Sequence, residues 1–231
     1  MKRVIVAIDG PSGAGKSTVA KLLASKLGYV YIDTGAMYRA IGWKARQEGV
    51  EPTEGPELQT MLRSTEVTLR PDGDLLRVYV DGTDVTGLIR TPEMSMAASK
   101  VSAQPSVRAR LLDLQRGMGK GGGVVLEGRD IGTVVFPGAE AKFFLVAAPE
   151  VRARRRYEEL LAKGEQVDYE STLKDVMKRD HDDESREIAP LAKAPDALTV
   201  DTTGMGIDEV VGLLVARVEE AARGPEASPW R

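Results

Sequence analysis

The sequence predicts an α/β fold in which a central parallel sheet is covered by helices. Short apolar runs alternate with segments of helical periodicity along most of the 231 residues, a pattern typical of parallel strands joined by helices. The first apolar run, Val4–Ile8, leads into a glycine-rich stretch that ends on Lys16-Ser17-Thr18, which indicates a strand, a loop and a helix start. Polar residues follow several of these runs, where such a sheet binds its ligands.

Composition restricts the function classes. Hydrophobic residues make up 42% and charged residues 29% of the chain, as in ordinary soluble proteins. The net charge of -3 provides no field over the whole chain that would attract nucleic acid or anionic lipid, so we expect neither partner. Cysteine is absent, which excludes disulfides, thiolate zinc sites and cysteine nucleophiles. No apolar run approaches the ~20 residues that cross a bilayer, and a cytoplasmic location is the simplest expectation.

The glycine-rich stretch fits the pattern G-x-x-x-x-G-K-[ST], which binds nucleotide phosphates. Its residues are Gly10, Pro11, Ser12, Gly13, Ala14, Gly15, Lys16, Ser17 and Thr18. Glycines let backbone N–H groups approach phosphate oxygens, the lysine adds charge at the β and γ phosphates, and Ser17 offers a hydroxyl to Mg²⁺. The alternative is a glycine-rich turn that matches by chance. The strand before it and the helical spacing of residues 19–27 after it argue against that alternative.

The remaining elements follow in order. Further strands are expected at residues 29–33, 124–127, 141–146 and 198–201, and helices at 36–47, 57–63, 93–118 with a break near Pro105, from about 150, at 169–178 and at 207–222. Residues 66–70 and 75–80 alternate polar and apolar side chains around a Pro-Asp-Gly turn, which predicts a hairpin with a third strand at 83–86. Taken alone, such a hairpin is more often an edge decoration.

The segment Asp33-Thr34-Gly35-Ala36-Met37-Tyr38-Arg39, just after the phosphate loop, resembles the bacterial cytidylate kinases, which are nucleoside monophosphate (NMP) kinases. The resemblance implies a three-layer α/β/α P-loop kinase with a central parallel sheet, an antiparallel NMP-binding insert and a helical, arginine-rich lid. It implies one kinase domain over residues 1–223: a core of 1–36, 100–150 and 190–223, an insert of about 37–99, a lid of about 151–189, and a flexible tail at 224–231.

The resemblance also implies substrate contacts. Arg39 would hold the phosphate of the acceptor with help from Thr34, Ser99 and Arg108 would contact the base, Arg129 would bind phosphate, Asp130 would bind the cytosine amino group, and Asp183 and Arg186 would bind the ribose and phosphate. Each has a structural alternative: solvated arginines on helices, a serine on a helix surface, or a charge pair that caps a loop. Glu184 stands where the family usually has a serine, so Ser185 is given no role.

Arginines gather on the helix expected after residue 150. Arg152 and Arg156 lie one turn apart with Arg155 beside them, an arrangement that repels itself unless anions bind. A solvated charged face is the common reading, but the position after a strand of an anion-binding fold favours phosphate contact. The residues expected to act in catalysis are Lys16, Arg129, Arg152, Arg155, Arg156 and Arg179. His181 is interpreted as a surface residue.

The phosphate loop predicts nucleotide binding, and the resemblance implies phosphoryl transfer, with Mg²⁺, from ATP to CMP or dCMP. The acceptor phosphate has a second pKa near 6, so it needs no general base at neutral pH. The resemblance suggests a monomer. Rival hypotheses are a kinase for UMP, dTMP or a metabolite such as shikimate, and a P-loop regulator that binds nucleotide without transfer. A common GTPase is disfavoured because its guanine motif needs asparagine, which this chain lacks.

Overall fold

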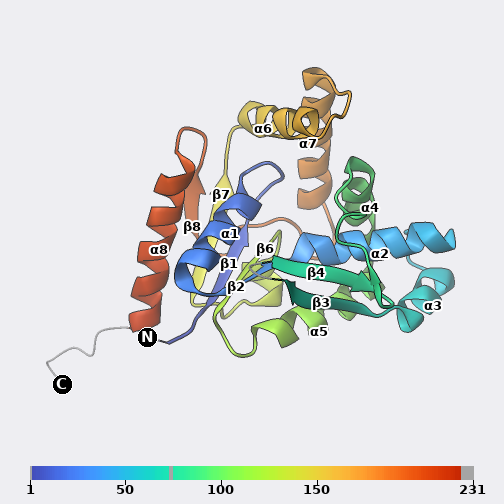
Figure 1. The fold of residues 1–231 in the computed structure, drawn as a ribbon, viewed down its shortest axis with the longest axis horizontal. Coiled ribbons are helices and arrows are strands. Elements are labelled where there is room, and N and C mark those ends of the chain that lie inside the picture. Colours follow the sequence, from blue (N-terminus) through green and yellow to red (C-terminus); the bar gives the residue numbers. More distant parts are fainter. Residues whose placement is uncertain (1, 73–74, 225–231) are drawn as a thin grey trace, which may run out of the picture.

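A five-stranded parallel sheet forms the centre of the computed structural model, which describes residues 2–72 and 75–224 (Figure 1). Its strands are β1 (Ile5–Asp9), β2 (Val30–Asp33), β6 (Val124–Gly128), β7 (Ala141–Val146) and β8 (Leu198–Asp201). The order is β2-β6-β1-β7-β8, and every neighbouring pair is parallel. The predicted parallel sheet is therefore confirmed, with β1 at its centre.

Side chains of β1 alternate between the two faces of the sheet, as the period of a strand requires. Val6 and Ile8 pack in a buried cluster with α1 (Lys16–Leu27) and α8 (Ile207–Arg223). Ala7 faces the opposite side, where its cluster includes Ile32 and, from α5 (Pro105–Gly119), Leu112. Helices therefore cover both faces, and the three-layer α/β/α prediction is confirmed.

The insert packs around a second hydrophobic cluster, to which α5 also contributes. It comprises α2 (Thr34–Glu48), α3 (Pro56–Ser64), β3 (Val67–Asp72), β4 (Leu75–Val80), β5 (Thr83–Asp84) and α4 (Pro92–Ser102). Strands β3, β4 and β5 form the expected antiparallel sheet. β5 is shorter than predicted, since the Thr86 side chain accepts the hydrogen bond of the Val78 N–H at 2.9 Å in place of backbone. Residues 73–74 at the predicted turn, and 225–231 of the predicted tail, lie outside the described residues.

Two features of the chain differ from the prediction. Helix α7 (Tyr169–Glu184) pairs with α6 (Pro149–Ala162) at the top of Figure 1, and it continues six residues beyond the predicted end at 178. A single turn of π-helix, η1 (Ile131–Val135), follows β6, where no helix was expected. Across the described ranges, no helix combines the length and apolar character needed to span a lipid bilayer.

Candidate active site

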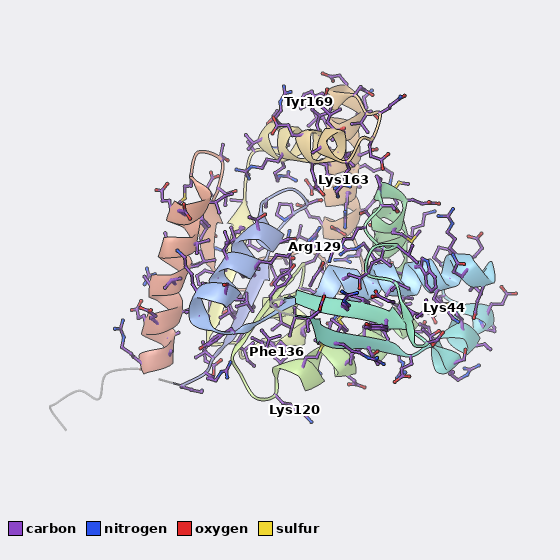
Figure 2. The ribbon with its side chains drawn as sticks, viewed as in Figure 1. Lys44, Lys120, Arg129, Phe136, Lys163 and Tyr169 are labelled. Carbon is purple, nitrogen blue, oxygen red and sulfur yellow. The ribbon has the colours of Figure 1, made fainter. Side chains whose placement is uncertain are left out.

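A cleft of about 640 Å³ opens at the carboxyl edge of the sheet, between the phosphate loop, α2, α4 and the α6–α7 pair. Arg129 and Lys163, both labelled in Figure 2, are among the residues that line it. Eleven lysines and arginines line it against five aspartates and glutamates. The chain as a whole carries a net charge of -3, so the positive charge is concentrated here. A concave basic surface of this kind attracts polyanions such as nucleotides.

The lysine of the phosphate loop is buried at the floor of the cleft. Its Nζ donates a hydrogen bond to the Pro11 carbonyl oxygen at 2.6 Å, and only 5% of Lys16 is exposed. Burial, followed by the positive charge of Arg129, holds the pKa of the Lys16 ammonium well below its ordinary value. An anion bound in the loop would compensate the buried ammonium charge, and it would therefore raise the pKa of Lys16.

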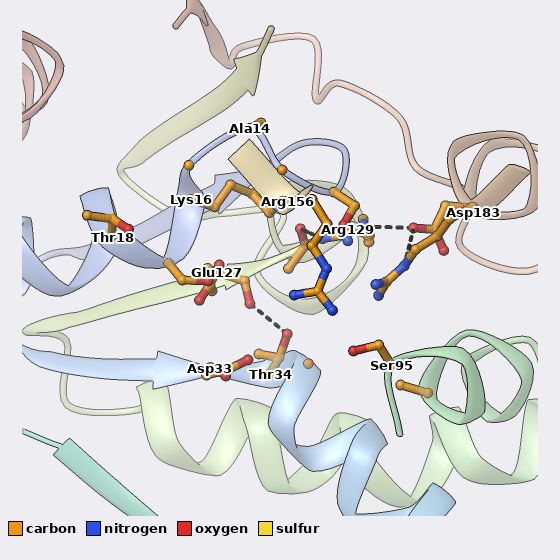
Figure 3. A pocket seen from close by; sticks show the side chains of 18 of the residues that line it. Ala14, Lys16, Thr18, Asp33, Thr34, Ser95, Glu127, Arg129, Arg156 and Asp183 are labelled. Carbon is orange, nitrogen blue, oxygen red and sulfur yellow. Dashed lines mark hydrogen bonds and ion pairs between the residues drawn. The ribbon is translucent and has the colours of Figure 1, made fainter. Parts of the chain in front are cut away.

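The start of α2 places Thr34 and Arg39 at the cleft. Asp33 caps the helix by accepting from the Ala36 N–H at 2.9 Å, and the same carboxylate holds Nη2 of Arg39 at 2.7 Å. The Thr34 hydroxyl donates to the Glu127 carbonyl oxygen at 2.7 Å, which ties β6 to α2 (Figure 3). Although burial opposes ionisation, Arg39 and the Ala36 N–H keep the pKa of Asp33 below its usual value.

A buried ion pair between Arg108 and Asp130 lines the cleft beside α4. Arg108 also donates to the Ser102 carbonyl oxygen at 3.2 Å, and Arg186 donates to the Ser102 hydroxyl at 2.8 Å. Ser99 lines the same wall. Burial raises the pKa of Asp130 even though Arg108 opposes the shift. Ser99, Arg108 and Asp130, the three residues that the resemblance assigns to the base, therefore line the same cleft.

Three arginines surround the buried carboxylate of Asp183. Arg129 Nε donates to it at 2.8 Å, while the nearest nitrogens of Arg179 and Arg186 stand 4.0 and 3.9 Å away (Figure 3). Burial, followed by the charge of Arg129, lowers the pKa of Arg179 to about 10. One carboxylate neutralises only one of the three guanidinium charges, so the cluster carries excess positive charge that would bind a further anion.

Several buried donors in this basic wall have no hydrogen-bond partner. Within the described part of the chain, they include Nε of Arg39, Nε of Arg179 and Nη2 of Arg186, and all three residues line the cleft. A buried polar atom without a partner costs free energy, roughly 1–3 kcal/mol and more when it is charged. Phosphate oxygens would satisfy all three donors.

The three arginines of α6 that were expected to act in catalysis fall into two groups. Arg155 and Arg156 line the cleft, where Arg155 donates to the Thr202 carbonyl oxygen at 2.6 Å and Arg156 pairs with Glu159 at 2.8 Å. Arg152 does not line the cleft, and its contacts are with Ser12, Ala147 and Asp180 instead. Gly10 and Pro11 also lie behind the cleft surface, while residues 12–18 of the phosphate loop line it.

The family model for cytidylate kinase matches residues 6–220. The chain belongs to the cytidylate kinase family. It is 52% identical over 217 residues to the cytidylate kinase of Geobacter sp. strain M21, covering 94% of this chain and 93% of that protein. It is 49% identical over 222 residues to the cytidylate kinase of Bacillus subtilis strain 168, and the match covers 96% of this chain and 99% of that protein. The family match includes every residue that lines the cleft.

A solved structure supports the fold independently. An uncharacterized protein from Eubacterium ventriosum superposes with a TM-score of 0.53 at 12% identity, covering 94% of this chain and 99% of that one. At so low an identity the likeness concerns the fold alone.

Two carboxylates that the sequence analysis left unassigned mark the side of the cleft next to Ser17. Asp33 and Glu127 are register partners at the ends of β2 and β6, and both line the cleft. Ser17 lines the cleft with them. Burial, followed by the charge of Asp33, raises the pKa of the Glu127 carboxylate. Two facing carboxylates and a hydroxyl fit Mg²⁺, which takes one or two protein carboxylates together with water and phosphate. No group of three or more potential metal ligands occurs among the described residues, so water and phosphate would complete the shell.

Tyr31 holds this carboxylate in place. Its buried hydroxyl donates to Glu127, and its ring lies under the Lys21 ammonium at 5.6 Å from the centroid. Nothing in the sequence pointed to Glu127, because an apolar run that ends in a carboxylate is common. Its pairing with Asp33 depends on β2 and β6 being neighbours, which is a property of the folded sheet.

Asp9 links the phosphate loop to the loop that carries Arg129 and Asp130. Its two carboxylate oxygens accept from the N–H groups of Ile131 and Gly132 at 2.8 and 2.7 Å. Burial raises the pKa of Asp9 to about 6 despite these two bonds; Asp130 raises it slightly further and Lys16 opposes it. The start of η1 is therefore held by the carboxylate oxygens of a side chain at the end of β1, which accounts for a helix that the sequence did not predict.

The raised pKa of Asp9 predicts a specific dependence of stability on pH. The folded protein keeps the Asp9 proton up to about pH 6, whereas the unfolded chain loses it near pH 3.8. Stability contributed by this group is therefore fully present below pH 4 and falls, by roughly 3 kcal/mol, as the pH rises to about 7. The unfolding free energy of wild type minus that of Asp9→Asn should decrease over that interval in urea titrations. Asp113→Asn, which removes an exposed carboxylate, should not change the slope there, and a flat difference for Asp9→Asn would contradict the assignment.

Proposed function

We propose that this chain transfers the γ-phosphate of ATP to CMP, and to dCMP, giving ADP and the corresponding diphosphate. The single observation that carries the proposal is the set of unpartnered guanidinium nitrogens of Arg39, Arg179 and Arg186, which lie in the same cleft as the phosphate loop. A site for a single nucleotide would not need a second group of anion-binding residues besides the phosphate loop. A kinase that brings two polyanions together needs one region for each of them.

The transfer step needs charge compensation and alignment more than proton transfer. An oxygen of the acceptor phosphate attacks the γ-phosphorus, the bond from that phosphorus to the bridging oxygen breaks, and ADP leaves with the electron pair. The acceptor is largely dianionic at neutral pH, so no base is required. Lys16 and Arg129 would neutralise the charge that develops on the transferred group, with Arg155, Arg156 and Arg179 closing from the lid. A bound Mg²⁺ would neutralise charge on the β and γ phosphates from the side of Ser17, Asp33 and Glu127.

Hydrogen-bond polarity selects the base. Cytosine carries an amino donor where uracil carries a carbonyl acceptor, and the Asp130 carboxylate accepts only from the former. Its pairing with Arg108 fixes the direction in which its free oxygen lone pairs point. Leaving these groups unmatched in a buried pocket costs about 1–3 kcal/mol, which corresponds to roughly 10- to 100-fold in discrimination.

The α6–α7 pair acts as the lid, and its closure would keep water away from the γ-phosphate. Arg155 reaches the loop after β8 through Thr202, on the donor side of the cleft. Asp183 would contact the acceptor ribose, and the balance between CMP and dCMP would depend on that contact. A monomeric state and a cytoplasmic location stay predictions from the sequence.

A panel of acceptors tests the proposal directly. With ATP and Mg²⁺, ADP release coupled to NADH oxidation should be fastest with CMP and dCMP, and kcat/KM for CMP should exceed that for UMP by tens of fold or more. Asp130→Ala should reduce this ratio by at least about tenfold, because it removes the acceptor for the amino group. Asp113→Asn should preserve the ratio. Preference for UMP, dTMP or shikimate would identify another kinase, and binding of ATP without transfer to any acceptor would indicate a regulator.

A further inference from the structure

Arg152 joins three separate parts of the site through one guanidinium group. Nε donates to the Ala147 carbonyl oxygen at 2.9 Å, just beyond the end of β7. Nη1 donates both to the Ser12 carbonyl oxygen of the phosphate loop at 3.1 Å and to the Asp180 carboxylate of α7 at 2.5 Å. Only 5% of Arg152 is exposed. These contacts engage Nε and Nη1, and Arg152 is not among the residues that line the cleft.

A second observation shows how closely the start of α6 is packed against the phosphate loop. A Cβ atom at Gly13 would lie 2.8 Å from the Arg152 carbonyl oxygen and 2.9 Å from its Cβ. Gly13 also has a φ of +76°, a conformation that other residues rarely adopt. The loop and the first turns of α6 are therefore in direct contact, and a displacement of one requires a displacement of the other.

Asp180 connects Arg152 to the arginine cluster around Asp183. Asp180 follows Arg179 on α7 and lies one turn before Asp183, which binds Arg129 at 2.8 Å. The charged groups that face Asp180 are Arg152 from α6 and Arg129 from the loop after β6. Any rotation or shift of α7 that moves Asp180 also moves Arg179 and Asp183, since all three lie on one rigid helix.

We infer that Arg152 is a positioning residue that couples occupancy of the phosphate loop to the arrangement of the acceptor-binding residues on α7. The inference rests on the proposed function, because it concerns how the two nucleotides of that reaction influence each other. ATP in the loop would fix the Ser12 carbonyl, Arg152 would transmit that position to Asp180, and α7 would present Arg179 and Asp183 to CMP. Direct contact of Arg152 with phosphate, suggested by the sequence, is the alternative that the test separates.

The pair Arg152–Asp180 allows variants that differ in geometry rather than in charge alone. Arg152→Lys keeps the positive charge, but a compact ammonium cannot reach three acceptors in different directions as the planar guanidinium does. Asp180→Asn keeps the size of the side chain and weakens the contact at its other end. Asp182→Asn is the matched control, since Asp182 is a partly exposed acid on the same helix, paired only with Lys178 in the described residues.

Calorimetric titration of CMP, with and without a non-hydrolysable ATP analogue, tests the coupling without requiring turnover. In wild type, the analogue should tighten CMP binding by about 5- to 150-fold, the usual range for coupled sites. In Arg152→Lys and in Asp180→Asn this factor should fall to about two or less, while the affinity for the analogue alone stays within about threefold of wild type. The double variant should lose no more coupling than either single variant, because both interrupt the same contact. Asp182→Asn should retain the wild-type factor.

Three outcomes would overturn the inference. Coupling could be absent in wild type, or it could survive in both Arg152→Lys and Asp180→Asn. Alternatively, Arg152→Lys could abolish kcat and weaken binding of the analogue while Asp180→Asn matches wild type, which would assign Arg152 to direct phosphate contact. Thermal melts of each variant exclude misfolding, and Asp180→Asn provides the test if Arg152→Lys does not fold. Failure of wild type to phosphorylate CMP is a separate result that would reject the proposed function itself.

Discussion

The kcat of CMP phosphorylation is expected to fall by about 10³-fold when Lys16 is replaced by methionine. Methionine has nearly the length of the lysine stem, so the buried aliphatic contacts are kept while the charge at the γ-phosphate is lost. Nζ of Lys16 already lies buried, bonded to the Pro11 carbonyl oxygen at 2.6 Å. Its environment is positive, which favours exchange of that contact for an incoming phosphate.

The measurement is kcat at saturating ATP and CMP. Loss of a charge that acts mainly in the transition state should lower kcat far more than it raises KM for CMP. Lys26→Met, at the exposed end of the same helix, is the control and should retain wild-type activity. Unchanged kcat in Lys16→Met, with a normal melting temperature, would show that the γ-phosphate is bound elsewhere.

The strand, loop and helix around Lys16 could be predicted because their signals are local. An apolar run, a set of glycines and a helical period of apolar residues each act within a few residues of sequence, and β1 and α1 lie where they indicated. The hairpin of the insert was equally predictable from its alternation. Its third strand was predicted at the correct place but with two residues too many. The strand ends early because the Val78 N–H donates to the Thr86 side chain instead of to backbone.

The features that sequence reasoning missed depend on contacts between distant segments. Residues 179–184 are almost all charged, which is typical of a loop, yet they continue α7 because their acids are neutralised by Arg129 and Arg152 from other elements. The π-turn at 131–135 has no periodic signal, and it is held by Asp9, more than 120 residues earlier.

The sequence predicted which types of residue form the candidate site, but not which contacts each of them makes. A set of arginines near a phosphate loop indicates anion binding, and most of the set lines the cleft. The sequence could not distinguish Arg155, which faces the cleft, from Arg152, three residues earlier on the same helix, whose guanidinium is bound to Ser12 and Asp180. That difference depends on which face of α6 meets the phosphate loop.

Gly10→Ala is expected to lower the free energy of unfolding by about 3 kcal/mol or more. Gly10 leaves β1 with a φ of +144°, and a Cβ atom there would lie 2.1 Å from the Leu145 carbonyl oxygen. That oxygen belongs to the backbone of β7, so no side-chain rotation can relieve the overlap. Either β7 moves away from β1 or the phosphate loop leaves its position, and both disrupt the centre of the sheet.

A graded series separates the two causes of this cost. Gly15 has a φ of +84° and open space around its Cβ position. Gly15→Ala should therefore lower the free energy of unfolding only by the cost of the left-handed backbone conformation, about 1–2 kcal/mol. Gly138→Ala has open space and no such φ, and it should lie within about 0.5 kcal/mol of wild type. Urea unfolding of the three variants should therefore rank them Gly138, Gly15, Gly10 in order of increasing loss. Equal losses for Gly10→Ala and Gly15→Ala would mean that the contact with β7 contributes nothing, and that the conformation of the loop alone requires glycine.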